Sequence, residues 1–319
     1  MLMWVPSDWV AAELAELAGV DVEVVALGRD MGETGAVGPL TVPASVADVE
    51  FYVPSFFPST ASSAVLSEMR RLRVVQALTA GVDWLRPHVP PSVALCNARG
   101  AHDASTAEWV VAAILGSLRA FPLFSAEQAA GRWSYQGTDQ LAGKNVLIVG
   151  YGAIGAAVER RLAGFEVTVR RIARSPRAAA GGMGEVAGLA DLPSLLPEAD
   201  VVVLLVPFTP ESKGLVGSDF LARMKDGALL VNAARGAVVD TGALVAEVAR
   251  GRLRAALDVT DPEPLPSGHD LWSMPGVFIT PHVAASTPVS RQRAALLVRE
   301  QAEAYLRGEP LRNVISGAY

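Results

Sequence analysis

The chain has 319 residues, of which 51% are hydrophobic and 19% are charged, and its formal net charge is −6. This length exceeds the size at which one hydrophobic core stops growing, so we expect two domains, and the composition excludes extensive disorder. The acidic balance gives no indication of nucleic-acid binding, and a single cysteine, Cys96, excludes an intrachain disulfide.

Short strands alternate with helices over about the first 98 residues. We expect strands at 22–26, 49–53, 74–76 and 93–96, and helices that include 8–17 and 62–71. Such alternation is typical of parallel strands joined by crossover helices, so it predicts a first α/β domain. Residues 28–43 are rich in glycine and predict a surface loop or hairpin.

Two loops of this domain follow predicted strands, and open α/β sheets bind ligands at the carboxyl ends of their strands. Pro54 and Ser55 begin a loop with two phenylalanines, which forms either a pocket wall or a packed core loop. Ala80, Gly81 and Val82 lie in a loop of small residues whose backbone N–H groups are suited to hold a carboxylate. Taken alone, the second loop is only a turn.

An apolar helix is expected at 109–121, long enough to connect two domains. The segment 131–141 is polar except for Trp133 and Tyr135. Exposed aromatic side chains of this kind often belong to a subunit contact.

A glycine-rich turn at 150–155 lies between a predicted strand at 145–149 and a predicted helix at 156–164. In such a unit the first glycine permits the tight turn, the second lets a pyrophosphate approach the backbone, and the third allows helix and strand to pack closely. The helix N-terminus then faces the phosphates. The alternative is an ordinary turn. The expected cofactor contacts here are Gly150, Gly152, Ala153, Ile154 and Gly155.

A second α/β unit continues from this turn. We expect strands at 167–171, 201–206, 228–232, 255–257 and 277–280, a flexible loop of small residues at 178–184, and a final helix at 288–307. The apolar positions of the final helix recur at helical spacing, so we expect it to return and pack on the first domain.

The end of the second strand of this unit is basic. An NAD site places an acidic residue there, about 20 residues beyond the glycines, to bind the ribose hydroxyls. Here Arg170, Arg171 and Arg174 occupy the region, and no carboxylate follows until Glu185. A guanidinium pairs with a 2′-phosphate, so the pattern favours NADP(H) over NAD, with a solvated basic loop as the alternative.

Three motifs follow three successive predicted strands: Asn-Ala-Ala-Arg-Gly at 232–236, Asp-Val-Thr-Asp-Pro-Glu-Pro at 258–264 and Thr-Pro-His at 280–282. Together with the glycine turn and Val-Pro-Phe-Thr-Pro-Glu-Ser at 206–212, they resemble the D-isomer-specific 2-hydroxyacid dehydrogenases over nearly the whole chain. The agreement of so many motifs in order outweighs the structural role that each residue would have alone.

This resemblance implies that Arg235, Glu263 and His282 are catalytic. Arginine can hold the substrate carboxylate and polarise the 2-oxo group, histidine can donate a proton to the forming alkoxide, and glutamate can orient the imidazole. The resemblance also implies that Asp258 contacts the nicotinamide carboxamide. Further residues that it assigns to the cofactor are Val206, Pro207 and Ala233, and those that it assigns to the substrate are Pro54, Ser55, Ala80, Gly81, Val82, Arg235 and His282.

The fold implied by the resemblance is α/β, with two doubly wound parallel-sheet domains. A Rossmann-type dinucleotide-binding domain at 99–283 is inserted in a flavodoxin-like substrate domain made of 1–98 and 284–319. Family analogy implies a homodimer and a small 2-oxo acid substrate, with no metal required. The basic segment points to the NADPH-using glyoxylate and hydroxypyruvate reductases, although the phenylalanines of the 53–57 loop are compatible with a bulkier 2-oxo acid.

Two rival functions share this scaffold. One is a phosphite or formate dehydrogenase, although formate enzymes carry glutamine where Glu263 stands here. The other is a cofactor-sensing corepressor or binding module. The first residues lack the basic segment of a signal peptide, and the apolar runs are much shorter than the ~20 residues that span a bilayer. We therefore expect a soluble, cytoplasmic protein without a membrane partner.

Overall fold

The structure is a computed structural model and describes residues 1–29, 41–179 and 184–316. The chain divides into two compact units, Met1–His102 with Ser286–Tyr319 (unit 1) and Asp103–Ala285 (unit 2). Each unit holds one parallel β-sheet with helices on both faces. The expected fold class of two parallel-sheet α/β domains is therefore confirmed.

Unit 1 has a five-stranded sheet in the order β2-β1-β4-β6-β7, and all of its neighbouring strands are parallel. With the strands numbered along the chain, this is the 2-1-3-4-5 order of flavodoxin-like domains. The strands are β1 (Leu2–Val5), β2 (Asp21–Val24), β4 (Phe51–Tyr52), β6 (Val74–Gln76) and β7 (Ala94–Cys96).

The sequence analysis did not predict β1, although Met3, Trp4 and Val5 are fully buried in it. A run of four residues that is buried on both faces lacks the alternation that identifies a half-buried strand. A further short antiparallel pair joins β3 (Gly28–Arg29) to β5 (Phe57–Pro58). Residues 30–40 of the predicted 28–43 loop lie outside the described residues.

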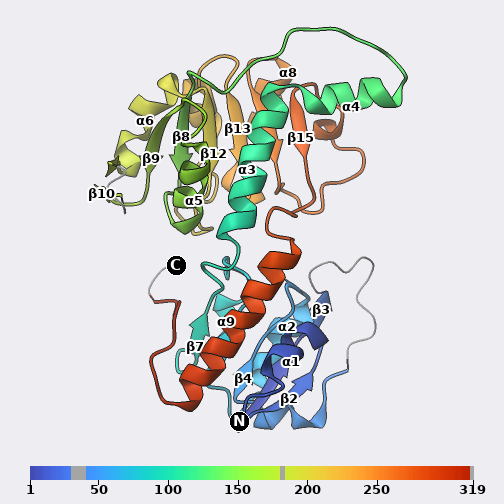
Figure 1. Cartoon of the computed structure of the whole chain (residues 1–319), viewed down its shortest axis with the longest axis vertical. Helices are drawn as coiled ribbons and strands as arrows, with labels where there is room; N and C mark the ends of the chain where they lie inside the picture. The colour runs from blue at the N-terminus through green and yellow to red at the C-terminus, as the bar shows by residue number, and fades with distance from the viewer. Residues whose placement is uncertain (30–40, 180–183, 317–319) are drawn as a thin grey trace. The chain divides into compact units, whose positions relative to one another are not determined.

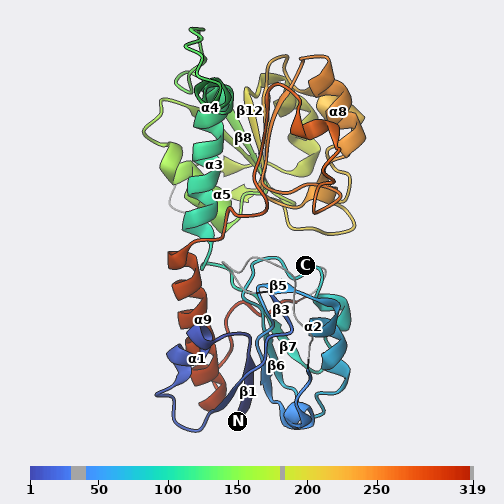
Figure 2. The same cartoon turned by 90° about the vertical axis from the view of Figure 1, so that its right-hand side faces the viewer.

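The helices of unit 1 lie on both faces of its sheet. Figure 2 shows α1 (Asp8–Leu14) and α9 (Pro288–Leu306) on one side of the strands and α2 (Thr60–Ala64) on the other. The packing of α9 on α1 confirms that the final helix returns to the first unit. The expected 62–71 helix is wrong in extent, because α2 passes into a single 3-10 turn, Val65–Ser67. Serines in this segment donate hydrogen bonds to nearby backbone oxygens, Ser63 to that of Thr60 and Ser67 to that of Ala64. Such local bonds compete with a longer helix.

Unit 2 has a six-stranded parallel sheet in the order β15-β14-β13-β12-β8-β9. Figure 1 shows these strands side by side between the helices. Beyond β9, a single parallel bridge between Ile172 and Ala187 occupies the place of the outer strand of a Rossmann sheet. The strands are β8 (Asn145–Val149), β9 (Thr168–Ile172), β12 (Val201–Leu204), β13 (Leu229–Asn232), β14 (Arg254–Leu257) and β15 (Val277–Ile279). All six were predicted, with ends that differ by at most two residues.

Two helical layers cover this sheet. The first, α3 (Asp103–Leu118) with α5 (Ala153–Leu162), packs on alternate residues of β8, β12 and β13. The second contains α6 (Leu192–Leu195), α7 (Ser218–Arg223) and α8 (Thr241–Ala249) and packs on the other residues of the same strands. Outside the main sheet, β10 (Arg177–Ala178) pairs with β11 (Glu185–Val186). Of the predicted 178–184 loop, Ala178 thus lies in a strand, and residues 180–183 are outside the described residues.

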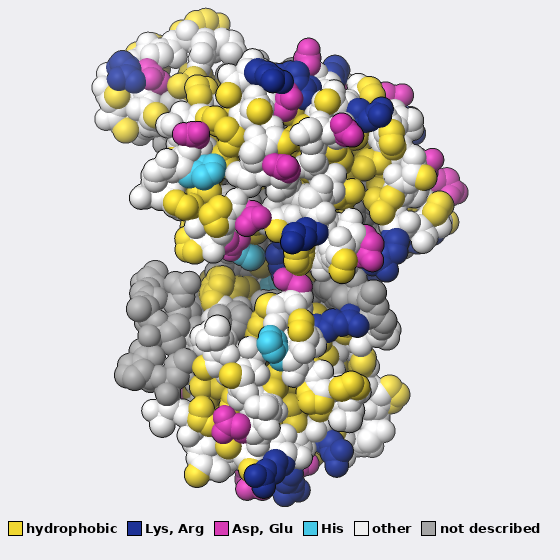
Figure 3. All heavy atoms as spheres, turned by 180° about the vertical axis from the view of Figure 1, so that it is seen from behind, with side chains coloured by type: hydrophobic (Ala, Val, Ile, Leu, Met, Phe, Trp, Pro, Cys, Tyr) yellow, Lys and Arg dark blue, Asp and Glu magenta, His cyan; other side chains and the backbone are white. Residues whose placement is uncertain are grey.

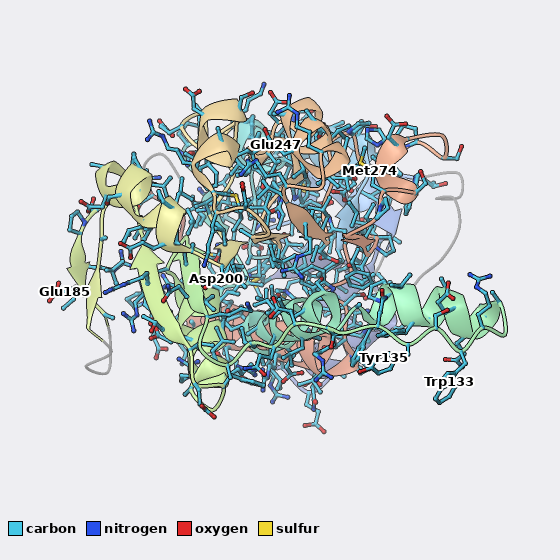
Figure 4. All side chains as sticks on the ribbon, turned by 90° about the horizontal axis from the view of Figure 1, so that it is seen from above. Trp133, Tyr135, Glu185, Asp200, Glu247 and Met274 are labelled. Carbon is cyan, nitrogen blue, oxygen red and sulfur yellow. The ribbon has the colours of Figure 1, made fainter. Side chains whose placement is uncertain are left out.

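The helix predicted at 109–121 is instead two helices. α3 begins six residues earlier than expected, and Ala120 adopts a left-handed backbone conformation, φ 54°, that turns the chain into α4 (Phe121–Ala129). We call α4 and the following residues 130–140 the arm. Trp133 and Tyr135 of the arm are 99% and 94% exposed, and Figure 4 shows Trp133 pointing away from the rest of unit 2. Their role in a subunit contact stays a prediction.

On the face drawn in Figure 3, Lys and Arg side chains are interspersed with Asp and Glu side chains of the described residues. Among those residues, no single helix is both long and apolar enough to cross a membrane; α3 and α4 meet that test only together, and they are bent by 67° at the break between them.

Candidate active site

The motifs that carried the sequence argument follow consecutive strands of the unit 2 sheet. Gly150 follows β8, Arg174 follows β9 and Val206 follows β12, while Arg235 and His282 follow β13 and β15. The strands are parallel and in register, with Leu204 opposite Asn232, so their carboxyl ends lie at one edge of the sheet. The sheet therefore gathers most of the predicted cofactor and catalytic residues at one edge, as expected for an open α/β sheet.

The three glycines of the turn have different surroundings. Gly150 has φ 103°, and a side-chain Cβ there would lie 2.4 Å from the backbone carbon of Leu205. A Cβ on Gly155 would lie 3.1 Å from the Gly150 oxygen, which shows how closely α5 packs on the turn. A Cβ on Gly152 would meet nothing within 4 Å, so the backbone is open to a ligand at that residue. The surroundings of Gly150 and Gly155 agree with a tight turn and close helix packing, while the pyrophosphate contact at Gly152 stays a prediction.

A pocket of about 300 Å³ lies beside the turn. Its lining includes Gly150, Gly152, Arg174, Val206 and Pro207, which were all predicted to bind the cofactor. The lining residues that were not singled out as cofactor contacts are Tyr151, Ala173, Leu189, Leu205, Thr209, Glu211, Ser212 and Leu215. Several of these belong to the 206–212 motif, whose Thr209 and Ser212 bond each other's backbone N–H groups.

The three predicted phosphate-binding arginines are in different places. Arg174 lines the pocket, whereas Arg170 is exposed on β9 and neither it nor Arg171 is among the described lining residues. Arg171 instead forms an ion pair with Glu159 of α5, and its Nε lies 2.7 Å from Glu159 Oε2. The hydrogen bonding of Arg171 to the Glu159 carboxylate, which accepts, is the main reason that the pKa of Arg171 is raised, with burial opposing it. Glu159 was not identified in the sequence, where it is one charged residue in an amphipathic helix.

His282 and Glu263 are in contact. His282 Nδ1 lies 2.7 Å from Glu263 Oε1, so this contact orients the imidazole. Nε2 is the ring nitrogen that does not make this contact. His282 has φ 55°, an uncommon conformation for a residue with a side chain, and its N–H donates to the Asp258 backbone oxygen at 2.7 Å. The backbone around the histidine is therefore held in a specific shape by the neighbouring strand end.

The Asp258 carboxylate also holds this turn. Its Oδ1 accepts hydrogen bonds from the Thr280 hydroxyl at 2.6 Å and the Val283 N–H at 2.9 Å, and its Oδ2 accepts one from the Ala284 N–H at 2.9 Å. The side chain is only 3% exposed. A contact with the nicotinamide carboxamide stays a prediction, whereas the role in fixing the turn that carries His282 was not predicted.

Arg235 lies in an extended loop after β13, where Asn232 donates to its backbone oxygen at 3.0 Å and its own Nη1 donates to the Ala234 oxygen at 2.9 Å. The next residue must be glycine, because a Cβ on Gly236 would lie 1.9 Å from the Thr260 oxygen. This close approach ties the arginine loop to the loop after β14.

The predicted substrate residues belong to unit 1. Pro54 and Ser55 follow β4 and are buried, and Ser55 Oγ has no hydrogen-bond partner among the described residues. Ala80, Gly81 and Val82 follow β6, where Asn97 donates to the Ala80 oxygen and Thr79 to the Gly81 oxygen. Both loops are at strand ends, as predicted.

A profile described as "D-isomer specific 2-hydroxyacid dehydrogenase, NAD binding domain" matches residues 111–284, more than half of the chain. The chain belongs to the D-isomer specific 2-hydroxyacid dehydrogenase family. The family resemblance seen in the sequence is therefore confirmed.

Individual relatives of the chain carry different names. A D-3-phosphoglycerate dehydrogenase of Archaeoglobus fulgidus is 31% identical over 79% of this chain and 49% of its own length. The chain thus spans about half the length of that relative. A glyoxylate reductase/hydroxypyruvate reductase of Mus musculus is 35% identical over 75% of this chain and 76% of its own.

Among solved structures, the chain is similar to a D-isomer specific 2-hydroxyacid dehydrogenase from Xanthobacter autotrophicus Py2 in complex with NADPH and MES. The TM-score is 0.81 at 30% identity, and the match covers 99% of this chain and 98% of the other. The match extends over both units and supports the two-domain fold of the family.

Proposed function

We propose that this dehydrogenase reduces small 2-oxo acids of the glyoxylate and hydroxypyruvate type with NADPH. The observation that carries the proposal is Arg174, a cation on the lining of the pocket beside Gly150 and Gly152. The end of β9 carries no carboxylate of the kind that binds ribose hydroxyls in NAD sites. The name of the mouse relative and the NADPH complex of the Xanthobacter structure support the same reading.

The residues present fit a dinucleotide. α5 begins at Ala153 with Gly152 as its N-cap and no side-chain cap, so its first N–H groups, including those of Ala153 and Ile154, are suited to receive a pyrophosphate. Arg174 would pair with the 2′-phosphate. Val206, Pro207 and Ala233 would contact the cofactor further along the sheet edge. When bound, NADPH supplies the hydride for the reaction.

Arg235 would hold the substrate carboxylate and polarise the 2-oxo group. A guanidinium stays charged at every working pH and offers two parallel donors to a carboxylate. The glycine that follows keeps its loop close to the Thr260 backbone, which limits the positions that the arginine backbone can take.

His282 would donate the proton to the developing alkoxide from Nε2, while Glu263 keeps Nδ1 hydrogen-bonded at 2.7 Å. In the oxidative direction the same nitrogen would take the proton back. Glu263 thus acts by orienting His282.

Unit 1 would supply the substrate domain and unit 2 the cofactor domain. Loops 54–55 and 80–82 of unit 1 would contact the 2-oxo acid, and the buried Ser55 hydroxyl, which has no partner among the described residues, supports this assignment. The backbone of the 80–82 loop would hold a substrate carboxylate.

One observation favours NADH as a second cofactor. Glu211 also lines the pocket, and a carboxylate there could accept bonds from ribose hydroxyls. A hydrogen bond from Thr209 is the main reason that its pKa is lowered. Use of NADH with little use of NADPH would support this alternative.

The decisive experiment measures oxidation of NADPH and NADH with glyoxylate, hydroxypyruvate, pyruvate and phenylpyruvate, and the reverse reaction with D-3-phosphoglycerate. We expect turnover with NADPH that His282→Ala and Arg235→Ala abolish and that the exposed control His88→Ala leaves unchanged. Arg174→Met should raise the KM for NADPH by about 10- to 100-fold, the value of one charge-assisted contact, and leave that for NADH unchanged. NADPH binding without turnover of any substrate would contradict the reductase and support a binding module.

We also propose a homodimer that uses the arm. Trp133 and Tyr135 are almost fully exposed there, and aromatic side chains are enriched in subunit interfaces. Light scattering should give twice the chain mass of 33.4 kDa for the native protein and a lower mass for Trp133→Asp. A native protein of 33.4 kDa would refute the dimer.

A further inference from the structure

Three side chains of unit 2 form a closed polar cluster beside the glycine turn. Glu159 of α5 is 8% exposed, and its Oε2 accepts hydrogen bonds from the Tyr151 hydroxyl at 2.5 Å and from Arg171 Nε at 2.7 Å. Arg171 Nη2 also binds Glu159 Oε1. The guanidinium carbon of Arg171 lies 5.8 Å from the centre of the Tyr151 ring. The cluster therefore joins the turn, the helix and β9.

The pairing fixes the Arg171 side chain. Two of its nitrogens bind the two oxygens of one carboxylate, which is the planar fork arrangement that arginine and carboxylate prefer. A carboxylate that is buried to this extent needs such a partner, because an unpaired charge in the interior is strongly unfavourable. Moving Arg171 to a phosphate would leave Glu159 without its cation.

The cluster is connected to the backbone that lines the pocket. The N–H groups of Gly150 and Tyr151 both donate to the Ile172 oxygen at 2.9 Å, next to Arg171, and Arg177 donates to the Tyr151 oxygen. A Cβ on Gly155 would lie 3.3 Å from Tyr151 Cδ2, so the tyrosine ring also packs on the first turn of α5. Tyr151 is thus held by its ring, its hydroxyl and both backbone groups.

Tyr151 lies between the two glycines that line the pocket, so the contacts that fix it also fix Gly150 and Gly152. We propose that Tyr151, Glu159 and Arg171 are positioning residues for the pyrophosphate-binding turn, and that Arg171 acts through Glu159 and not on the 2′-phosphate. The inference rests on the proposed use of this pocket by a nicotinamide cofactor. Because NADPH and NADH share the pyrophosphate, the cluster affects both cofactors equally, whereas Arg174 distinguishes them.

The test compares dissociation constants of NADPH and NADH, measured by fluorescence titration. We expect Arg171→Met to raise both constants by the same factor, about tenfold, the usual size of a coupling between neighbouring sites, and to leave kcat at saturating cofactor unchanged. The double variant Glu159→Gln/Arg171→Met removes both charges and should recover most of the affinity. Tyr151→Phe, which removes only one hydroxyl, should raise both constants by a smaller common factor.

The control is Arg160→Met, the exposed neighbour of Glu159 on α5, which should change neither constant. The proposal is overturned if Arg171→Met weakens NADPH binding and spares NADH, because Arg171 would then read the phosphate. It is also overturned if Arg171→Met or Tyr151→Phe lowers only the thermal stability and leaves both constants unchanged. Failure of the native protein to bind either cofactor would instead refute the proposed function, and this inference with it.

Discussion

The substitution Asp258→Asn would separate two roles of the Asp258 carboxylate, which are to hold the turn that carries His282 and to contact the nicotinamide. The structure shows that its two oxygens accept hydrogen bonds from Thr280, Val283 and Ala284 at 2.6 to 2.9 Å. An asparagine can keep its oxygen at the place of Oδ1, but its NH₂ group then faces the Ala284 N–H. The change therefore removes one bond, puts two donors against each other and converts the other two bonds from charged to neutral.

The magnitude follows from these three bonds. A hydrogen bond to a charged group contributes roughly 1.5 to 3 kcal/mol, and the two retained bonds lose about half of that. We expect Asp258→Asn to lower the free energy of unfolding by about 3 to 6 kcal/mol, measured by urea unfolding at pH 7. The turn also carries His282, and a displacement of a catalytic group by about 1 Å lowers the rate by about 100-fold. We therefore expect kcat to fall by about 100-fold.

The comparison that decides the role of Asp258 is between kcat and the dissociation constant of NADPH. We expect kcat and stability to fall together while the dissociation constant changes by less than about threefold, the effect of a weak neutral contact. The exposed neighbour Asp261→Asn serves as the control. A variant with native stability and kcat but with much weaker NADPH binding would refute this reasoning and support the nicotinamide contact that the family resemblance implies.

Three further changes test other parts of the structure. Gly236→Ala should destabilise the fold by about 1 to 3 kcal/mol and lower the melting temperature, because its Cβ would lie 1.9 Å from the Thr260 oxygen. The control Gly242→Ala in α8, whose Cβ would lie 3.4 Å from Asp240 Oδ1, should not lower it. Equal melting temperatures for the two variants would contradict the close approach. Burial raises the pKa of Asp200, but bonds from the Asn145 N–H and from Lys225 lower it more, to below its ordinary value. The stability that Asp200 contributes is thus present above pH ~4 and lost as the pH falls through its lower folded pKa. In urea unfolding, the free energy of unfolding of Asp200→Asn should be lower than that of the native protein at pH 7, and the difference should be smaller at pH 3. The same difference at both pH values would refute this link between protonation and stability. Burial raises the pKa of the Cys96 thiol to about 11. At pH 8 a thiol reagent should therefore react much more slowly with the folded protein than with the urea-unfolded protein. Equal reaction rates would show that the end of β7 opens.

In unit 2, four strands could be predicted because each is a short run of mostly buried apolar side chains bounded by turn residues; they are β8, β12, β13 and β14. The same rule failed for β1, whose residues Leu2, Met3, Trp4 and Val5 are all apolar and show no alternation with polar side chains. It also failed at Ala120, because alanine is a strong helix former and nothing local predicts its left-handed conformation. Tertiary packing decides both features.

The candidate site was predictable as a set of strand ends, since motif order fixes which residues follow which strand. The partners of those residues were not, because they are set by register and packing between segments far apart in the chain. Asp258 bonds N–H groups 25 and 26 residues later, and no spacing rule connects them.

The arginines after the glycine turn show this limit most clearly. Arg170 and Arg171 differ in the sequence by one position, but side chains alternate across a strand, so only one of them can face α5. Glu159, twelve residues earlier, binds the one that does and leaves Arg174, beyond the strand, at the pocket. Sequence composition therefore indicates a basic cofactor site, while a single buried carboxylate on the neighbouring helix determines which cation we expect the cofactor to meet.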